Sequence, residues 1–214
     1  MKAPPNIVPC FPWGRRVGRM LLAFLAAALP ATPVWAATPQ VEIKTSAGLI
    51  VAELYPDKAP RTVENFLRYV SEGFYSGTLF HRVIPGFMIQ GGGYAADFTE
   101  KPTRPPIPNE AANGLSNEPG TLAMARTPDP HSAAAQFFIN TAHNRFLDHA
   151  SPTPQGYGYA VFGRVVEGME TVRRIARTPT GRGGPFPADV PRQPVLIESV
   201  RILAAPVSSQ RKTP

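Results

Sequence analysis

One arginine stands in an otherwise apolar segment, Phe80-His-Arg-Val-Ile-Pro-Gly-Phe-Met-Ile-Gln-Gly-Gly92. A residue as polar as Arg82 in a strand should face solvent, pair with an acid or serve a site. A guanidinium is always charged and carries several donors on a rigid plane, so it can stabilise electron density that develops in a reaction. If the strand is regular, Phe87 and Met88 project to opposite faces, and Gln90 shares the face of Met88.

Two further segments combine polar and aromatic residues in the same manner. The first runs from Gly120-Thr-Leu-Ala-Met-Ala-Arg126 to Gln136-Phe-Phe-Ile-Asn140, and the second joins Phe146-Leu-Asp148 to Tyr159-Ala-Val-Phe-Gly163. Phenylalanines such as these ordinarily belong to a core. The glycine triplet 91–93 lacks both the G-x-G-x-x-G spacing and a following Lys-Ser/Thr, so we do not expect a phosphate loop.

The elements that must position these residues are mostly short strands. Residues 40–45 and 49–55 alternate apolar and polar side chains around Gly48, which predicts a hairpin. Pro60 and Gly168 are expected to open two helices, and residues 195–203 a last strand. Other short apolar runs occupy residues 79–84, 87–90, 121–125, 136–140 and 160–166.

Many short strands with only two helices favour a barrel of about eight strands over a layered α/β sheet. Side chains fill the interior of a barrel of this size. A ligand must then bind on the outer face or at the rim, which the loops 94–120 and 150–158 could shape.

Residues 1–36 read as a cleaved signal peptide. Four basic residues and no acidic one precede or flank an apolar run of ten residues, Met20 to Leu29, and cleavage is expected after Ala36 or Ala37. The run is too short for a membrane anchor, which needs about 20 residues. The residues after Arg15-Arg16 fit a twin-arginine signal poorly, so general secretion is favoured.

The predicted mature protein carries little charge and no thiol. The whole chain has a formal net charge of +7, and loss of the four basic residues of the signal leaves +3, so nucleic acid is not an expected partner. Cys10 is the one cysteine and lies in the signal, which leaves no disulfide to form. We therefore expect a single domain over residues 37–203 and a frayed tail over residues 204–214.

These segments together resemble the cyclophilin family of peptidyl-prolyl cis-trans isomerases. The long signature at 80–92 is followed in order by Asn109-Glu110, Gly120, Met124-Ala125, Gln136-Phe-Phe138 and Val161-Phe-Gly163, and the resemblance covers residues 40–203. Phe146 and Tyr159 are most similar to the bacterial periplasmic branch. The resemblance implies a mainly β fold, a closed eight-stranded antiparallel barrel capped by two α-helices, which agrees with the pattern of strands above. It also implies rotation about X-Pro bonds of exported proteins as the activity, the periplasm as the location, and no cofactor or metal.

The resemblance also implies roles for individual residues. Arg82 would donate to the prolyl nitrogen, and Gln90 would hold the substrate carbonyl and orient Arg82. Gln136 would give further polar support. The apolar pocket for the proline ring would be lined by Phe87, Met88, Phe138 and Leu147. Main-chain groups of Ala125 and Arg126 would contact the extended peptide.

Three residues depart from the pattern of many family members. Phe146 replaces Trp, Tyr159 replaces His, and Arg126 replaces Asn. The loss of the indole donor predicts weak cyclosporin binding with isomerase activity retained. The other two changes leave the preference for the residues around the proline open.

The sequence leaves two alternative functions to compare with isomerase activity. The same fold could be a non-catalytic proline-peptide-binding or chaperone-like module, although the complete set around Arg82 argues for catalysis. A metal-dependent or nucleophilic hydrolase is disfavoured because the four histidines match no H-x-x-x-H motif and no G-x-S-x-G occurs. Asn109, Glu110 and Asp148 are expected to be structural. Nothing in the sequence requires an oligomer, so a monomer is expected. No stable membrane anchor is expected.

Overall fold

The computed structural model describes residues 38–203. The predicted signal peptide (1–36) and the predicted tail (204–214) lie outside the described residues. Within 38–203, no helix is both long and apolar enough to cross a membrane.

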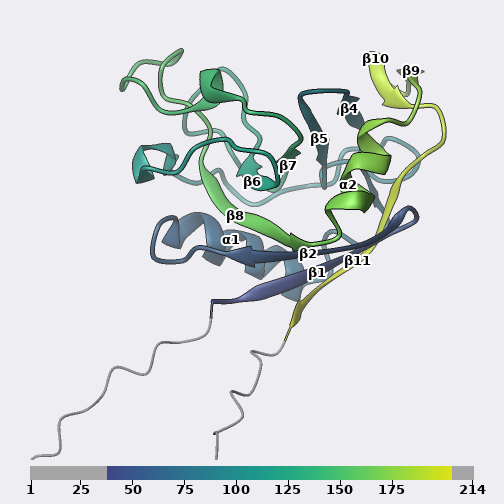
Figure 1. Cartoon of the computed structure of the whole chain (residues 1–214), viewed down its shortest axis with the longest axis horizontal. Helices are drawn as coiled ribbons and strands as arrows, with labels where there is room; N and C mark the ends of the chain where they lie inside the picture. The colour runs from purple at the N-terminus through teal and green to yellow at the C-terminus, as the bar shows by residue number, and fades with distance from the viewer. Residues whose placement is uncertain (1–37, 204–214) are drawn as a thin grey trace, which may run out of the picture. The chain divides into compact units, whose positions relative to one another are not determined.

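One strongly curled antiparallel sheet forms the body of the domain (Figure 1). Its order is β3-β11-β1-β2-β8-β6-β7-β5-β4. The strands are β1 (Gln40–Thr45), β2 (Gly48–Leu54), β3 (Thr78–Leu79), β4 (Arg82–Ile84), β5 (Met88–Gly91), β6 (Thr121–Met124), β7 (Phe137–Asn140), β8 (Val161–Glu167) and β11 (Leu196–Leu203).

The two ends of this order are consecutive parts of one chain segment. Only Phe80 and His81 separate β3, which pairs with β11, from β4, which pairs with β5. The segment 78–84 therefore joins both ends of the sheet, and counting it as one interrupted strand gives eight strands. The predicted mainly β fold with two helices is confirmed.

The helices α1 (Pro60–Ser71) and α2 (Met169–Ala176) pack their apolar sides into the sheet's interior. Phe66 of α1 lies at the centre, with its ring centroid 5.1 Å from that of Phe162 and 5.5 Å from that of Phe137. Interlocked aromatic rings of this kind fill a barrel interior and leave no room there for a ligand.

Glu110 holds the start of α1. Its carboxylate accepts hydrogen bonds from the backbone N–H groups of Arg61 and Thr62, at 3.1 and 2.8 Å, and from the Thr62 hydroxyl at 2.7 Å. The first N–H groups of a helix have no partner inside the helix, and a carboxylate also complements the positive end of the helix dipole. Glu110 is thus structural, as the sequence predicted.

Alternation along the strands separates the core from a second apolar cluster. Val83, Ile89 and Ile139 join the main core, whereas their neighbours in sequence face the other side of the sheet. The outer cluster consists of Met88, Ala123, Phe138, Leu147 and Val161, with partly buried Ile84, Phe87, Leu115, Ala125 and Tyr159 packed against it.

A separate hairpin stands beside β4 near the top of Figure 1. It consists of β9 (Thr180–Gly183) and β10 (Phe186–Pro191). Two short 3-10 helices, Ala111–Asn113 and Arg145–Leu147, interrupt the connecting loops. The sequence predicted neither the hairpin nor these helical turns.

Candidate active site

A row of cross-strand neighbours on the outer face brings the central residues together. Arg82 of β4 pairs with Gln90 of β5, and Gln90 pairs with Phe138 of β7. Phe138 in turn pairs with Ala123 of β6. Directly opposed residues on antiparallel strands project to the same face, so the sheet register alone places a guanidinium, an amide and a phenyl ring next to one another.

The guanidinium is held by a chain of side-chain hydrogen bonds. Arg82 Nη1 donates to Gln90 Oε1 at 3.3 Å, and Gln90 Nε2 donates to Gln136 Oε1 at 3.0 Å. Gly93 makes space for Gln136, the third residue in this series of hydrogen bonds, since a Cβ atom at position 93 would overlap the Gln136 side chain. The chain fixes the orientation of the Gln90 amide, which leaves its oxygen toward Arg82.

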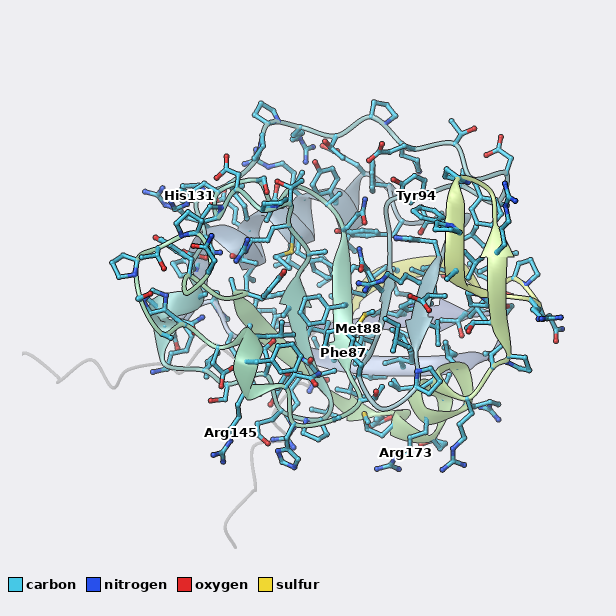
Figure 2. The ribbon with its side chains drawn as sticks, turned by 90° about the horizontal axis from the view of Figure 1, so that it is seen from above. Phe87, Met88, Tyr94, His131, Arg145 and Arg173 are labelled. Atoms are coloured by element: carbon cyan, nitrogen blue, oxygen red, sulfur yellow. The ribbon has the colours of Figure 1, made fainter. Side chains whose placement is uncertain are left out.

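These side chains border a small pocket with an empty volume of about 380 Å³. Figure 2 looks onto this face, with Phe87 and Met88 near its centre. Nine of the residues predicted from the sequence line the pocket: Arg82, Phe87, Met88, Gln90, Ala125, Arg126, Phe138, Leu147 and Tyr159. One charged edge and several apolar walls suit a ligand with a compact apolar ring and a polar backbone.

Phe87 does not follow the alternation expected of a regular strand. β5 begins only at Met88, and Phe87 belongs to the turn after β4, where its N–H donates to the Ile84 carbonyl at 3.1 Å. Gly86 adopts a left-handed φ of 70° in that turn. The turn swings Phe87 to the same side as Met88, so both line the pocket instead of opposite faces.

A buried network of asparagines supports this turn from below. Asn144 Nδ2 donates to the Phe87 carbonyl at 2.9 Å and to Asn140 Oδ1 at 2.7 Å. Asn140 Nδ2 donates onward to Asn117 Oδ1 at 3.1 Å, and Asn117 donates to Asp148 Oδ1. Asp148 is therefore a structural acceptor, as predicted, and the network fixes the pocket floor.

Two of the three departures from the family pattern contact each other. The Arg126 guanidinium lies 4.5 Å from the centroid of the Tyr159 ring, a cation–π arrangement. Arg126 Nε also donates to the Gly158 carbonyl at 3.0 Å. The pair closes one wall of the pocket, where the Tyr159 ring meets Phe138 at a centroid distance of 5.7 Å.

The third departure, Phe146, lies at the rim. Its side chain is 73% exposed, and its ring stacks on Phe87 with centroids 5.6 Å apart. Phe146 does not line the pocket itself. Its open face could meet a ligand that extends beyond the pocket.

A second hollow, with an empty volume of about 670 Å³, adjoins the first and shares Gln90, Ala125 and Arg126 with it. Gln136 lies here. The loop 94–120 was expected to shape the binding surface. The other residues that line this hollow were not predicted from the sequence; they are Glu100, Thr103, Pro106, Thr127, Ser132, Ala134 and Ala135. Loop residues such as these carry no periodicity from which contact with a site could be read.

The hairpin β9–β10 adds an acidic residue that the sequence did not predict at this site. Asp189 Oδ2 lies 3.9 Å from Arg82 Nε. The two residues are 107 positions apart, and Asp189 belongs to a segment rich in proline and glycine that reads as a loop, so no sequence signal linked them. Pairing with an acid was one of the three roles expected for an arginine in a strand, and Asp189 is such an acid.

The four histidines do not form one cluster, although His131 and His149 both contact the ring of Tyr157. His81 is buried between Tyr94 and Phe186, and burial lowers its pKa to about 4, opposed by a backbone hydrogen bond at Leu79 and assisted by Arg82. His131 accepts from the Asn109 N–H at 3.1 Å, His143 pairs with Glu118, and His149 contacts the Tyr157 carbonyl at 2.8 Å. No group of three metal-binding side chains occurs within residues 38–203.

Comparison with known proteins places this arrangement in context. A family model described as cyclophilin type peptidyl-prolyl cis-trans isomerase/CLD matches residues 40–202. The chain is 60% identical to a peptidyl-prolyl cis-trans isomerase of Streptomyces antibioticus over 163 residues, which are 76% of this chain and 98% of that protein. It is 48% identical to peptidyl-prolyl cis-trans isomerase A of Dickeya dadantii over 192 residues, 87% of this chain and 99% of the relative.

A solved structure shares the fold. The crystal structure of a Cryptosporidium parvum cyclophilin type peptidyl-prolyl cis-trans isomerase in the presence of the dipeptide Ala-Pro matches with a TM-score of 0.62 and 26% identity. The match covers 77% of this chain and 99% of that one.

Proposed function

The chain belongs to the family of cyclophilin-type peptidyl-prolyl cis-trans isomerases and is an enzyme of that activity, and from this premise we propose that Arg82 is its catalytic residue. The observation that carries the proposal is the position of the Arg82 guanidinium, tethered to Gln90 at the edge of an apolar pocket.

The reaction needs a fixed donor rather than a nucleophile. Rotation about an X-Pro bond faces a barrier of about 18–20 kcal/mol because the peptide bond has partial double-bond character. At the twisted transition state this resonance is lost, and the prolyl nitrogen gains a localised lone pair. A cationic donor aimed at that nitrogen binds the transition state better than the planar ground state, and each tenfold acceleration requires about 1.4 kcal/mol of such difference.

The surrounding residues divide the remaining work. The proline ring enters the apolar pocket formed by Phe87, Met88, Phe138 and Leu147, which fixes one side of the rotating bond. Gln90 holds the substrate carbonyl and keeps Arg82 in place through the hydrogen bond at 3.3 Å. Gln136 braces Gln90, and the main chain at Ala125 and Arg126 lies where an extended peptide leaves the ring.

Variants at Arg82 distinguish catalysis from simple binding. Arg82→Ala should still bind a proline peptide but lose most of its acceleration of cis-trans exchange, and Arg82→Lys should recover only part, because an ammonium lacks the planar fork. Wild-type protein that binds the peptide without accelerating exchange would instead favour the chaperone-like module.

Export to the periplasm is a second part of the proposal, and it rests on residues 1–36. The signal would direct the enzyme to proline-containing segments of proteins that fold after export. The isolated mature protein should begin at Ala37 or Thr38 and appear in the periplasmic fraction. Full-length protein in the cytoplasm, starting at Met1, would argue against this location and against the periplasmic branch.

A further inference from the structure

The hairpin β9–β10 presents one carboxylate to the catalytic arginine. The 3.9 Å separation between Asp189 Oδ2 and Arg82 Nε joins two side chains that are each a little over 40% exposed. Arg82 Nη1 already donates to Gln90. Among residues 38–203, no hydrogen-bond acceptor is found for Nη2. The guanidinium thus faces protein groups at Nη1 and at Nε, and its Nη2 is free for a substrate.

The backbone that presents Asp189 is unusual. Asp189 has a left-handed φ of 67°, and Phe98 is the one other non-glycine residue with positive φ among the described residues. The hairpin register also shifts between Phe186 and Val190, so the residues between them form a bulge. Bulges re-aim side chains, and strained backbone is retained where a side chain must occupy a particular place. Aspartate tolerates the left-handed region better than most residues.

Aromatic packing anchors the hairpin beside Arg82. Phe186 stacks on His81, the residue directly before Arg82, with ring centroids 5.3 Å apart and planes inclined by 26°. Tyr94 meets Phe186 edge-on at 5.0 Å and lies beside the yellow-green hairpin in Figure 2. The second left-handed residue, Phe98, packs on Gly184 of the hairpin turn, where a Cβ atom would overlap its ring. Phe98 therefore helps to hold in place the hairpin that carries Asp189.

We propose that Asp189 is a positioning residue whose carboxylate, next to Nε, helps to hold the Arg82 guanidinium in place while Nη2 stays available to the substrate. This inference rests on the proposed role of Arg82. Without Asp189, Gln90 would be the remaining anchor, and the guanidinium could rotate about its single hydrogen bond. The peptide still binds in the apolar pocket, so the defect should fall on kcat and not on KM.

The test uses Asp189→Asn in the whole mature protein. Asparagine keeps the shape of the side chain and also tolerates a left-handed backbone, so the charge alone is removed. Asp57→Asn, an exposed residue in the turn before α1, is the matched control. A capped, uncharged Ala-Pro peptide removes any effect of substrate charge.

The assay is exchange NMR at about 10 mM and at about 1 M salt, where the Debye length falls from about 30 Å to about 3 Å. At low salt we expect Asp189→Asn to lower kcat about threefold to tenfold with KM nearly unchanged. At high salt the ratio of wild-type to variant kcat should shrink toward one. The control should match wild type throughout, and the melting temperature of Asp189→Asn should stay close to that of wild type.

Three results would overturn the proposal: equal kcat of Asp189→Asn and wild type at low salt, a loss of kcat that salt leaves unchanged, or a loss explained by unfolding. Arg82→Ala, measured in parallel, separates this failure from that of the proposed function. If Arg82→Ala is inactive while Asp189→Asn is fully active, only the role of Asp189 fails. If Arg82→Ala is fully active, the role of Arg82 fails first.

Discussion

Arg82, Gln90 and Phe138 owe their proximity to strand register, and the sequence could predict only part of this. Alternation assigned Gln90 and Met88 to one face correctly. It could not predict the place of Phe87, because the Pro85-Gly86 turn interrupts the strand, nor the pairing of β5 with β7, which joins residues about 50 positions apart. The chemistry of the site was visible in residue types, whereas its geometry depends on long-range pairing.

Gly93 offers a test of the hydrogen-bonded chain that orients Arg82. Gly93→Ala should leave the fold intact, since the overlap is with the flexible side chain of Gln136 and not with backbone. Displaced Gln136 can no longer brace Gln90, so we expect kcat/KM to fall about threefold to tenfold, the loss of about one hydrogen bond. Isomerase assays and circular dichroism of the variant check this. An unchanged kcat/KM would mean that the brace does not matter.

Phe146 carries the prediction on cyclosporin. Its exposed ring stacks on Phe87 but lacks the donor of an indole. Phe146→Trp should strengthen cyclosporin binding about fivefold to tenfold, because one hydrogen bond contributes about 1 kcal/mol, while isomerase activity stays near wild type. Titration calorimetry gives the two affinities. Equal affinities of wild type and variant would remove the explanation based on the indole.

At the level of elements, apolar periodicity predicted both helices and the strands of the large sheet. The sequence did not predict the hairpin β9–β10 because glycines and prolines interrupt its residues, Thr-Gly-Arg-Gly and Phe-Pro-Ala-Asp-Val-Pro, and such residues are typical of loops. Its place is set by aromatic contacts with His81 and Tyr94, which come from distant parts of the chain. Elements that are held by tertiary contacts alone leave little trace in local sequence.

The cap on α1 gives a prediction at this scale. Glu110→Ala removes three hydrogen bonds at the helix start and should lower the free energy of unfolding by about 1–2 kcal/mol, with kcat/KM unchanged. Urea unfolding and the isomerase assay measure the two quantities. Glu64→Gln, which breaks an exposed pair with Arg68 on the same helix, is the control and should cost less than about 0.5 kcal/mol. A fall in kcat/KM at full stability would instead indicate a role in the reaction.

For the molecule as a whole, the curled sheet separates two tasks. Its interior holds the aromatic core around Phe66, and its outer face holds the pocket around Met88 and Phe138. The sequence predicted this division, because a small closed barrel must bind ligands outside. The fold can therefore present a rigid surface to an extended peptide without opening its core.

His81 links global stability to pH. Its pKa of about 4 in the folded state lies below the ordinary value of 6.5, so the unfolded chain binds the proton more readily. The contribution of neutral His81 to the free energy of unfolding amounts to about 3 kcal/mol. It is fully present above about pH 6.5 and is lost as pH falls toward 4. His81→Phe keeps an aromatic ring between Tyr94 and Phe186 and should flatten that part of the stability profile. Urea unfolding of wild type and His81→Phe between about pH 4 and pH 6.5 measures this difference. If the free energy of unfolding fell equally with pH in both proteins, His81 would not be the group responsible.

The central claim is that Arg82 stabilises the twisted prolyl bond, and exchange NMR on a proline peptide tests it most directly. Because the assay needs no coupled protease, it reports the rotation itself. Removal of one preorganised donor from a site typically costs about a hundredfold to a thousandfold in rate, so Arg82→Ala should lose at least about a hundredfold in kcat/KM while it remains folded and still binds the peptide. Exchange at the wild-type rate in Arg82→Ala would contradict the account.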